Sequence, residues 1–422
     1  MPKPVAAPPA PSRNGSDLRG INRLTTDAIV GVADLVEAVH ANVLDLPGVL
    51  GKSRSRQTRG IPGFVYRSVR GVARLVGGGV DAALAGFTPL LAKIGAPPQR
   101  EAVLAALNGV LGDHLAATGN PLAIESRLRV DGRALQLKRR PLAEALPNAG
   151  GKLLVMVHGL CMNDLQWRHD GHDHGAALAR EFGFTRVDLH YNTGVRIADN
   201  GRDFAQALER LTAAWPVPVE TIVIVGHSMG GLVARSACHA AAESGQNWLA
   251  QLDKLVFLGT PHHGAPLERA GSWVDMLIGL SPYSAPFARL GKLRSAGIQD
   301  LRHGNVRAGD GQDRDGDGRA DGRTPLPLPD AVSCYAVATT IGAAREDPVR
   351  EETRTDGLVA VASALGQHPD RAFDLGIPAS RRWVGHGINH LQLLSDPAVY
   401  RQLQRWLSGK PRIRRARRSG ET

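Results

Sequence analysis

The segment that decides the fold is TIVIVGHSMGG, residues 221–231, in which an apolar run leads directly into a G-x-S-x-G pattern. In this pattern, between a strand and a helix, the serine forms a nucleophile elbow and stands at the end of a parallel sheet. The turn is so sharp that Ser228 must adopt a strained backbone conformation, while Gly226 and Gly230 let the strand and the helix approach closely. The segment therefore predicts a nucleophile at Ser228, with the Met229 amide at a helix N-terminus that favours a developing oxyanion.

On both sides of this segment, short apolar runs alternate with helical stretches. We expect strands at 153–157, 186–190, 221–225, 254–258 and 332–338, and helices near 174–182, 200–215 and 231–244. Strict alternation of this kind is typical of a parallel sheet with crossover helices. The prediction is an α/β-hydrolase fold, a mostly parallel doubly wound sheet, with a helical N-terminal region and a lid-like insertion. The insertion is residues 266–329, where the alternation breaks.

The rest of the chain divides by composition. Residues 1–16 are rich in Pro and Ala without a long apolar core, which predicts a disordered tail rather than a signal peptide. Residues 17–120 carry the three-and-four apolar spacing of amphipathic helices, one of them at about 100–115. These helices form either a cap on the catalytic domain, 121–409, or a surface for lipid or a second subunit. Residues 410–422 form a basic tail.

Charge and cysteine content limit the partners and the compartment. The formal net charge is +11, and the stretches 52–74 and 410–418 carry basic residues and no acidic ones, a pattern that favours anionic surfaces. No interleaved aromatics or zinc spacing accompany the charge, so we expect no nucleic-acid partner, and peripheral contact with an anionic membrane or plain solvation explains it better. The three cysteines are odd in number and widely spaced, which predicts a reducing, cytoplasmic location. No apolar stretch is long enough to span a membrane.

The oxyanion loop is predicted upstream of the elbow, where strand 153–157 runs into His158-Gly159-Leu160. A hydrolase of this fold needs a second N–H donor from the loop after its third strand, and Leu160 is in the position to supply it. His158 is expected to orient the loop rather than to titrate.

The partners of Ser228 should follow it in the order acid, then histidine. Asp356 lies in T-D-G-L-V, residues 355–359, and His390 lies in N-H-L, residues 389–391. His390 would act as general base, and Asp356 would fix its tautomer and stabilise the imidazolium. The alternatives are His386 for the base and Asp347 or Glu351 for the acid.

Four segments together carry a resemblance to a known family. They are Val157-His158-Gly159, the elbow 226–231, the turn L-G-T-P-H-H-G at 258–264, and the pair 355–359 with 389–391. From Lys152 to Leu407 the chain resembles the lipase and esterase branch of the α/β-hydrolase superfamily that includes GPI-inositol-deacylase-like proteins. The resemblance implies hydrolysis of an ester or lipid substrate, an internal Ser-Asp-His triad, no required cofactor, and a turn at 259–264 that lines the site without reacting. A thioesterase or acyltransferase would use the same triad, and a non-catalytic lipid-surface protein is the competing class.

Two polar stretches suggest metals. Asp313, Asp315, Asp317 and Asp321 occupy positions 1, 3, 5 and 9 of a calcium loop, but position 12 is Thr324, so calcium binding and an acidic solvated loop are the two interpretations. The histidine-rich run 169–174 has no zinc spacing and predicts a polar loop with Asp173 as helix N-cap. Residues 191–194 either shape the mouth of the site or merely turn the chain.

Overall fold

The computed structural model describes residues 98–265, 295–311, 322–343 and 354–409. The chain divides into two compact units, Met1–Pro97 with Leu115–Ala123, and Pro98–His114 with Ile124–Thr422. Of the first unit only Leu115–Ala123 is described; it contains the end of a helix and a turn in which the Asn120 amide donates to the Leu115 carbonyl. The second unit contains the sheet and the candidate site.

The second unit is built on an eight-stranded sheet with the strand order β2-β1-β4-β3-β5-β6-β7-β8. The strands are β1 Arg127–Val130, β2 Arg133–Ala134, β3 Lys152–Val157, β4 Thr185–His190, β5 Thr221–His227, β6 Leu252–Leu258, β7 Ser333–Thr340 and β8 Arg382–His386. Strands β3 to β8 are parallel, and β1 pairs antiparallel with both β2 and β4. The predicted mostly parallel sheet is confirmed.

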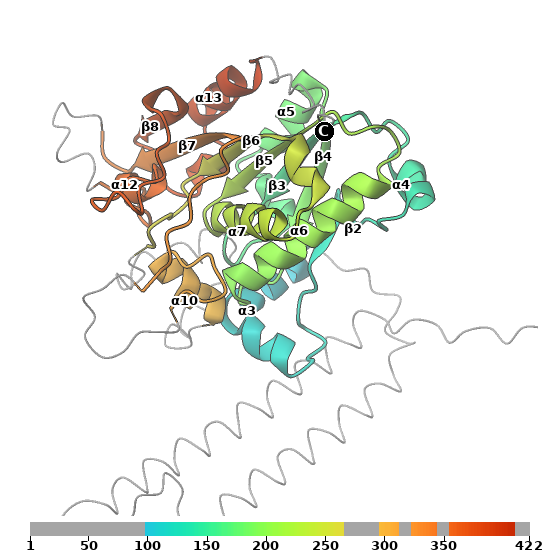
Figure 1. Ribbon diagram of the computed structural model, residues 1–422, viewed down its shortest axis with the longest axis horizontal. Coiled ribbons are helices and arrows are strands. Elements are labelled where there is room, and N and C mark those ends of the chain that lie inside the picture. The colour runs from blue at the N-terminus through green and yellow to red at the C-terminus, as the bar shows by residue number, and fades with distance from the viewer. Residues whose placement is uncertain (1–97, 266–294, 312–321, 344–353, 410–422) are drawn as a thin grey trace, which may run out of the picture. The chain divides into compact units, whose positions relative to one another are not determined.

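Helices cover both faces of this sheet (Figure 1). The helices are α3 Pro98–Ala117, α4 Arg139–Ala145, α5 His174–Phe182, α6 Ile197–Ala214, α7 Met229–Glu243, α10 Ala296–His303, α12 Val361–Ala364 and α13 Pro397–Leu407, and the short 3-10 turns are η2 Asp164–Trp167, η3 Asn247–Gln251, η5 Ala379–Arg381 and η6 Gln392–Leu394. None of the helices in the described ranges is long and apolar enough to cross a membrane.

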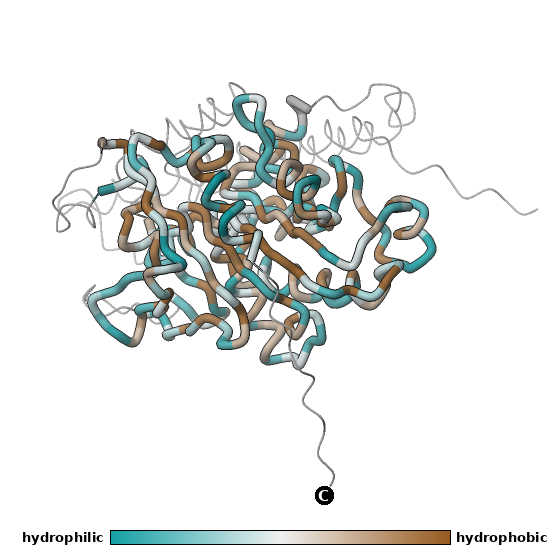
Figure 2. Tube along the Cα trace, turned by 90° about the horizontal axis from the view of Figure 1, so that it is seen from above, coloured by the Kyte–Doolittle hydropathy of each residue, from teal (hydrophilic) through white to brown (hydrophobic). Residues whose placement is uncertain are grey.

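The central strands are buried on both faces, so their side chains alternate between two cores. On β3, Val155 packs in the cluster that contains Phe204 of α6, whereas Met156 packs in the cluster that contains Leu178 of α5 and Leu403 of α13. This explains why β3 and β5 are continuous apolar runs rather than alternating ones. Figure 2 shows the same pattern as hydrophobic segments inside and hydrophilic ones on the surrounding turns.

The strand order reverses beside β3. From β3 the chain goes to β4 on one side and then crosses to β5 on the other, and β6, β7 and β8 follow outward. Ligands of open α/β sheets bind beyond the carboxyl ends of the strands at such a switch point. The residues that follow β3 and β5 at this point are His158 and Ser228.

The predicted strands are all present within two residues at each end, and so is the predicted helix at about 100–115, which is α3. Three strands were missed: β1 and β2 are short and rich in arginine, and β8 is short and mostly half-buried, so none of them forms an apolar run. Of the predicted insertion, the structure describes α10 and the segments around it. The predicted tails, most of the N-terminal region and the rest of the insertion lie outside the described residues.

Candidate active site

Ser228 stands at the junction of β5 and α7, in a backbone conformation that L-residues rarely adopt. Its φ is 53° and its ψ is −124°, which confirms the predicted strain. The two glycines are needed here because a Cβ on Gly226 would lie 2.7 Å from Gly231 Cα, and one on Gly230 would lie 2.2 Å from the Val157 carbonyl oxygen. The Ser228 amide donates to the Leu258 carbonyl at 2.8 Å, which ties the elbow to β6.

Asp356 and His390 form a buried pair close to this elbow. The Asp356 Oδ2 and His390 Nδ1 atoms are 2.7 Å apart, and both side chains are almost wholly buried. The other oxygen of Asp356, Oδ1, accepts hydrogen bonds from the amides of Leu358 and Val359 at 2.9 and 2.8 Å. A carboxylate held by neutral donors keeps its negative charge available for the imidazole.

The second ring nitrogen of His390, Nε2, is buried and has no hydrogen-bond partner among the described residues. Catalytic hydrogen bonds of this kind are often long or poorly aligned in the absence of substrate, so the geometry does not exclude His390 as the base. The alternative base, His386, lies instead beside Thr340, with 3.3 Å between His386 Nδ1 and the hydroxyl oxygen. The alternative acids Asp347 and Glu351 lie outside the described residues.

The predicted oxyanion loop lies against the nucleophile. A Cβ on Gly159 would be 3.2 Å from Ser228 Cβ, so a side chain there would crowd the serine. Leu160 follows, buried, and the Met229 amide opens α7, where a helix offers it no internal acceptor. Burial and the neighbouring His190 lower the pKa of His158 to about 3, so its ring stays neutral, as expected of a residue that does not titrate in the working range.

Residues 191–194, for which the sequence left two roles open, support this loop. The Tyr191 hydroxyl donates to the His158 carbonyl at 2.8 Å, and the Tyr191 ring stacks on the His158 ring with 4.5 Å between centroids. The Cys161 amide donates to the Thr193 hydroxyl at 3.2 Å. The segment therefore holds the main chain on both sides of Gly159 and Leu160.

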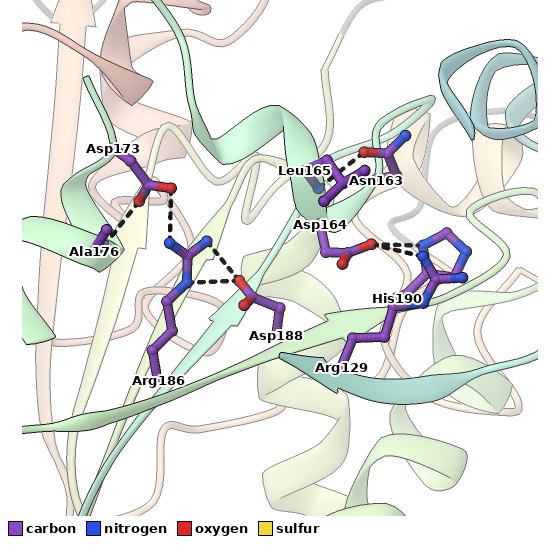
Figure 3. A network of polar contacts seen from close by, with 9 residues as sticks. All are labelled: Arg129, Asn163, Asp164, Leu165, Asp173, Ala176, Arg186, Asp188 and His190. Atoms are coloured by element: carbon purple, nitrogen blue, oxygen red, sulfur yellow. Dashed lines mark hydrogen bonds and ion pairs between the residues drawn. The ribbon is translucent and has the colours of Figure 1, made fainter. Parts of the chain in front are cut away.

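A second polar network adjoins the oxyanion loop and was missed in the sequence (Figure 3). The Asp164 carboxylate contacts Arg129 at 3.1 Å and His190 at 3.2 Å, and Arg129 also contacts Glu101 at 3.2 Å. Burial alone would raise the pKa of Asp164, but the interactions with His190 and Arg129 outweigh it and hold that pKa below its usual value. These residues come from four elements, α3, β1, η2 and β4, of which β1 and β4 are paired strands, so no local motif predicts the network.

The remaining part of Figure 3 shows the contacts of Asp173, which belongs to the histidine-rich run. Asp173 caps α5 by accepting from the Ala176 amide at 2.9 Å, as predicted, and its other oxygen accepts from Arg186 at 2.7 Å. Arg186 also donates twice to the buried Asp188. His172 pairs with His174 through their ring nitrogens at 2.9 Å. No group of metal-binding side chains is found among the described residues, and the predicted calcium ligands Asp313, Asp315, Asp317 and Asp321 lie outside them.

The turn after β6 lines the site as the resemblance implies. Gly259 has φ 58°, and a Cβ there would lie 3.1 Å from His390 Cε1. His262 points away, with its Nδ1 3.3 Å from an Arg235 guanidinium nitrogen, and burial holds its pKa well below the usual value. The turn therefore shapes the space around the imidazole without supplying a titrating group.

Comparisons with known proteins agree with this architecture. Residues 185–285 match the family model of the PGAP1-like alpha/beta domain, a span that includes the elbow and the turn after β6. No curated protein matches the sequence significantly. Over residues 185–285 the predicted resemblance is confirmed: this part of the chain is similar to the PGAP1-like alpha/beta domain, and it lies within the mostly parallel sheet.

The solved structures that match the chain include three bacterial proteins. A mature lipase of Bacillus licheniformis is 16% identical, with 60% of this chain and 90% of that chain covered and a TM-score of 0.38. A lipase-esterase related protein of Clostridium acetobutylicum is 11% identical, with 61% and 94% covered and a TM-score of 0.34. A thermophilic esterase of Thermogutta terrifontis is 17% identical, with 62% and 90% covered and a TM-score of 0.33.

Proposed function

We propose that the chain is a serine hydrolase that cleaves carboxylic esters through an acyl-enzyme on Ser228. The observation that carries the proposal is the buried Asp356–His390 pair, 2.7 Å apart, whose histidine contacts His227, the residue before the strained Ser228, through its carbonyl oxygen. A nucleophile, a base and a group that orients the base are the three parts needed for nucleophilic catalysis. The α/β-hydrolase fold supports the same reaction class.

In the proposed reaction, Ser228 Oγ attacks the ester carbonyl carbon while His390 Nε2 takes the hydroxyl proton. Collapse of the tetrahedral intermediate breaks the carbon–oxygen bond, and the imidazolium gives its proton to the leaving alcohol. Water, activated by the same nitrogen, then hydrolyses the acyl-enzyme and releases the acid. Asp356 accepts the hydrogen bond from Nδ1 and stabilises the imidazolium without itself becoming protonated.

The amides of Leu160 and Met229 are the proposed oxyanion donors. Support comes from the closeness of Gly159 to Ser228 Cβ and from the place of Met229 at the start of α7. Both amides belong to main chain that is fixed before substrate arrives, because Tyr191 and Thr193 hold one and the helix holds the other. Pre-organised donors of this kind contribute about 3–4 kcal/mol each to transition-state stabilisation.

The proposed substrate is an ester or a lipid. A thioesterase or acyltransferase would use the same residues and differ only in leaving group or acceptor.

The net charge of +11 supports a protein that touches an anionic membrane from the cytoplasmic side, and a non-catalytic lipid-surface role is the competing hypothesis. Bound calcium at 313–321 stays a prediction, tested by whether chelator lowers the melting temperature.

The test is hydrolysis of p-nitrophenyl esters from acetyl to palmitoyl, together with labelling by a fluorophosphonate. We expect S228A and H390A to lower kcat by about 10³-fold or more, because the members of a triad act as a unit. The matched control is H386A, which should keep the activity since His386 contacts Thr340 rather than Asp356. A folded wild type that neither cleaves these esters nor reacts with the fluorophosphonate would favour the lipid-surface role.

A further inference from the structure

His390 has three hydrogen-bonded anchors, two on its main chain and one on its ring, and one of the main-chain anchors comes from the nucleophile segment. The His390 amide donates to the Asp356 carbonyl at 2.9 Å, and the His390 ring binds the Asp356 carboxylate at 2.7 Å. The His390 carbonyl oxygen lies 3.2 Å from Nε2 of His227, the residue that precedes Ser228. His227 and His390 are 163 positions apart in the sequence, so this contact joins the nucleophile segment to a distant part of the chain.

The His227 side chain is buried between two other rings. It is the last residue of β5 and only 1% exposed. Its ring lies 4.8 Å from the His390 ring and 6.3 Å from the Trp167 ring, centroid to centroid. Because protein interiors are close-packed, a side chain held between two rings constrains the positions of the groups that it contacts.

The contact with His390 decides which nitrogen of His227 carries the proton. A carbonyl oxygen only accepts, so Nε2 must be the donor. The other nitrogen, Nδ1, has no hydrogen-bond partner among the described residues and lies 3.0 Å from where a Cβ of Gly159 would be. Burial and the nearby His390 hold the pKa of His227 well below its usual value, so the ring stays neutral and does not compete with His390 for protons.

We propose that His227 is a positioning residue for the base: its Nε2–H holds the main chain of His390 at a fixed distance from the serine that follows His227 in sequence. The inference rests on the proposed function and deepens it. It assigns a role to the histidine of the G-H-S-M-G segment that neither attacks nor transfers a proton. The contact is made at the main-chain carbonyl of His390. It therefore fixes the position of the His390 backbone, and with it the position of the imidazole, and does not set the protonation of the ring.

The variants that test it differ in whether they donate at the position of Nε2. H227F fills the space without a donor, and H227Q places an amide N–H near the position of the imidazole Nε2. We expect H227F to lower kcat by about 10- to 100-fold with KM within about 2-fold, because misplacement of a reacting group by about 1 Å costs up to 10²-fold. H227Q should recover most of that loss, and H239Q, on the outer part of α7, is the histidine control. H227N, whose amide is too short to reach, replaces H227F if the latter does not fold.

Two further measurements separate positioning from general damage. In an H390A background, H227F should change the residual rate by less than about 2-fold, because residues that act as a unit are not additive. An equal loss with and without His390, or an H227F enzyme with wild-type kcat, overturns the proposal.

The low-field proton NMR signal of the His390 Nδ1–H gives a reading that does not need activity. It should shift or broaden in H227F and persist in H227Q. A second outcome is a wild type that cleaves no ester while the signal still changes in H227F and persists in H227Q. That result would contradict the proposed function but support the positioning role of His227. An unchanged signal in H227F would overturn the positioning role whatever the activity.

Discussion

Two buried Asp–His pairs lie at the same end of the sheet, and they differ in what else the carboxylate contacts. Asp164 contacts His190 at 3.2 Å and the Arg129 guanidinium at 3.1 Å. Asp356 contacts His390 at 2.7 Å and two backbone amides, and no arginine or lysine among the described residues lies within ion-pair distance of it. The first carboxylate is neutralised by a fixed cation, whereas the second has only neutral donors and an imidazole.

Under the proposed function, this difference separates a structural pair from a reactive one. The positive charge of a neighbouring guanidinium offsets the negative charge of the carboxylate. Such a carboxylate therefore stabilises an imidazolium that forms during a reaction only weakly. No cation in the described part of the chain offsets the charge of Asp356, so that charge acts fully on His390. An Asp–His contact therefore indicates catalysis only after the other partners of the carboxylate have been counted.

The largest expected effect comes from neutralising each carboxylate in turn. D356N should lower kcat by about 10³- to 10⁴-fold, because the amide favours the wrong tautomer of His390. D164N should leave kcat within about 10-fold and instead lower the free energy of unfolding by about 3 kcal/mol, since it leaves Arg129 buried without its full charge partner. Ester hydrolysis and urea unfolding of both variants measure the contrast. Comparable losses of kcat in D356N and D164N would remove the distinction.

The next effect comes from the cation itself. R129M should lower the free energy of unfolding by about 3 kcal/mol, because Glu101 and Asp164 then both lose the cation that they share. The matched control is R127M, two residues away on the same strand, where the arginine is 55% exposed and pairs with a 74% exposed Glu125. That change should stay within about 0.5 kcal/mol. Equal destabilisation of the two variants would show that burial of the first pair does not matter.

A smaller effect concerns pH. The pKa of His158 is lowered to about 3, so between the ordinary value of 6.5 and about 3 the unfolded chain binds a proton that the folded chain does not. His158 thus contributes stability that is present above pH 6.5 and is lost as pH falls below it, by about 1.4 kcal/mol per pH unit. Unfolding of wild type and H158N at pH 5 to 7.5 should show a shallower dependence in the variant. Parallel curves would mean that His158 is not held neutral.

The smallest expected effect is on the support of the oxyanion loop. Y191F removes the hydroxyl that donates to the His158 carbonyl and should cost about 1 kcal/mol of unfolding free energy. Because the loop then loses one of its two supports, kcat should fall a few-fold with KM nearly unchanged. If KM rises while kcat is kept, Tyr191 serves substrate binding rather than the loop.

Local patterns account for the parts of the molecule that the sequence predicted well. The buried parallel strands are continuous apolar runs, and the elbow is a strand–turn–helix whose glycines are dictated by backbone contacts within the motif and its neighbouring strand. Asp173 was predicted as an N-cap because a cap acts within three residues. In contrast, β1 and β2 have no apolar run, since they lie at the edge of the sheet and carry three arginines.

The choice between His390 and His386 needed the folded chain, because both follow Asp356 by a similar distance in sequence. Residues 355–359 and 389–391 meet only when strands β7 and β8 are paired, and the pairing leaves His386 beside Thr340. The contacts of Asp164 with Arg129 and His190 depend in the same way on β1 lying against β4.

The sequence by itself determined the parallel sheet, the strained serine and the order in which its partners follow, because each of these depends on residues that are neighbours along the chain. Only the tertiary structure decided which histidine meets which carboxylate, what neutralises each carboxylate, and that His227 reaches the main chain of His390. Those properties depend on side chains far apart in sequence and on burial, since a charge or a hydrogen bond gains its strength from the surroundings that exclude water.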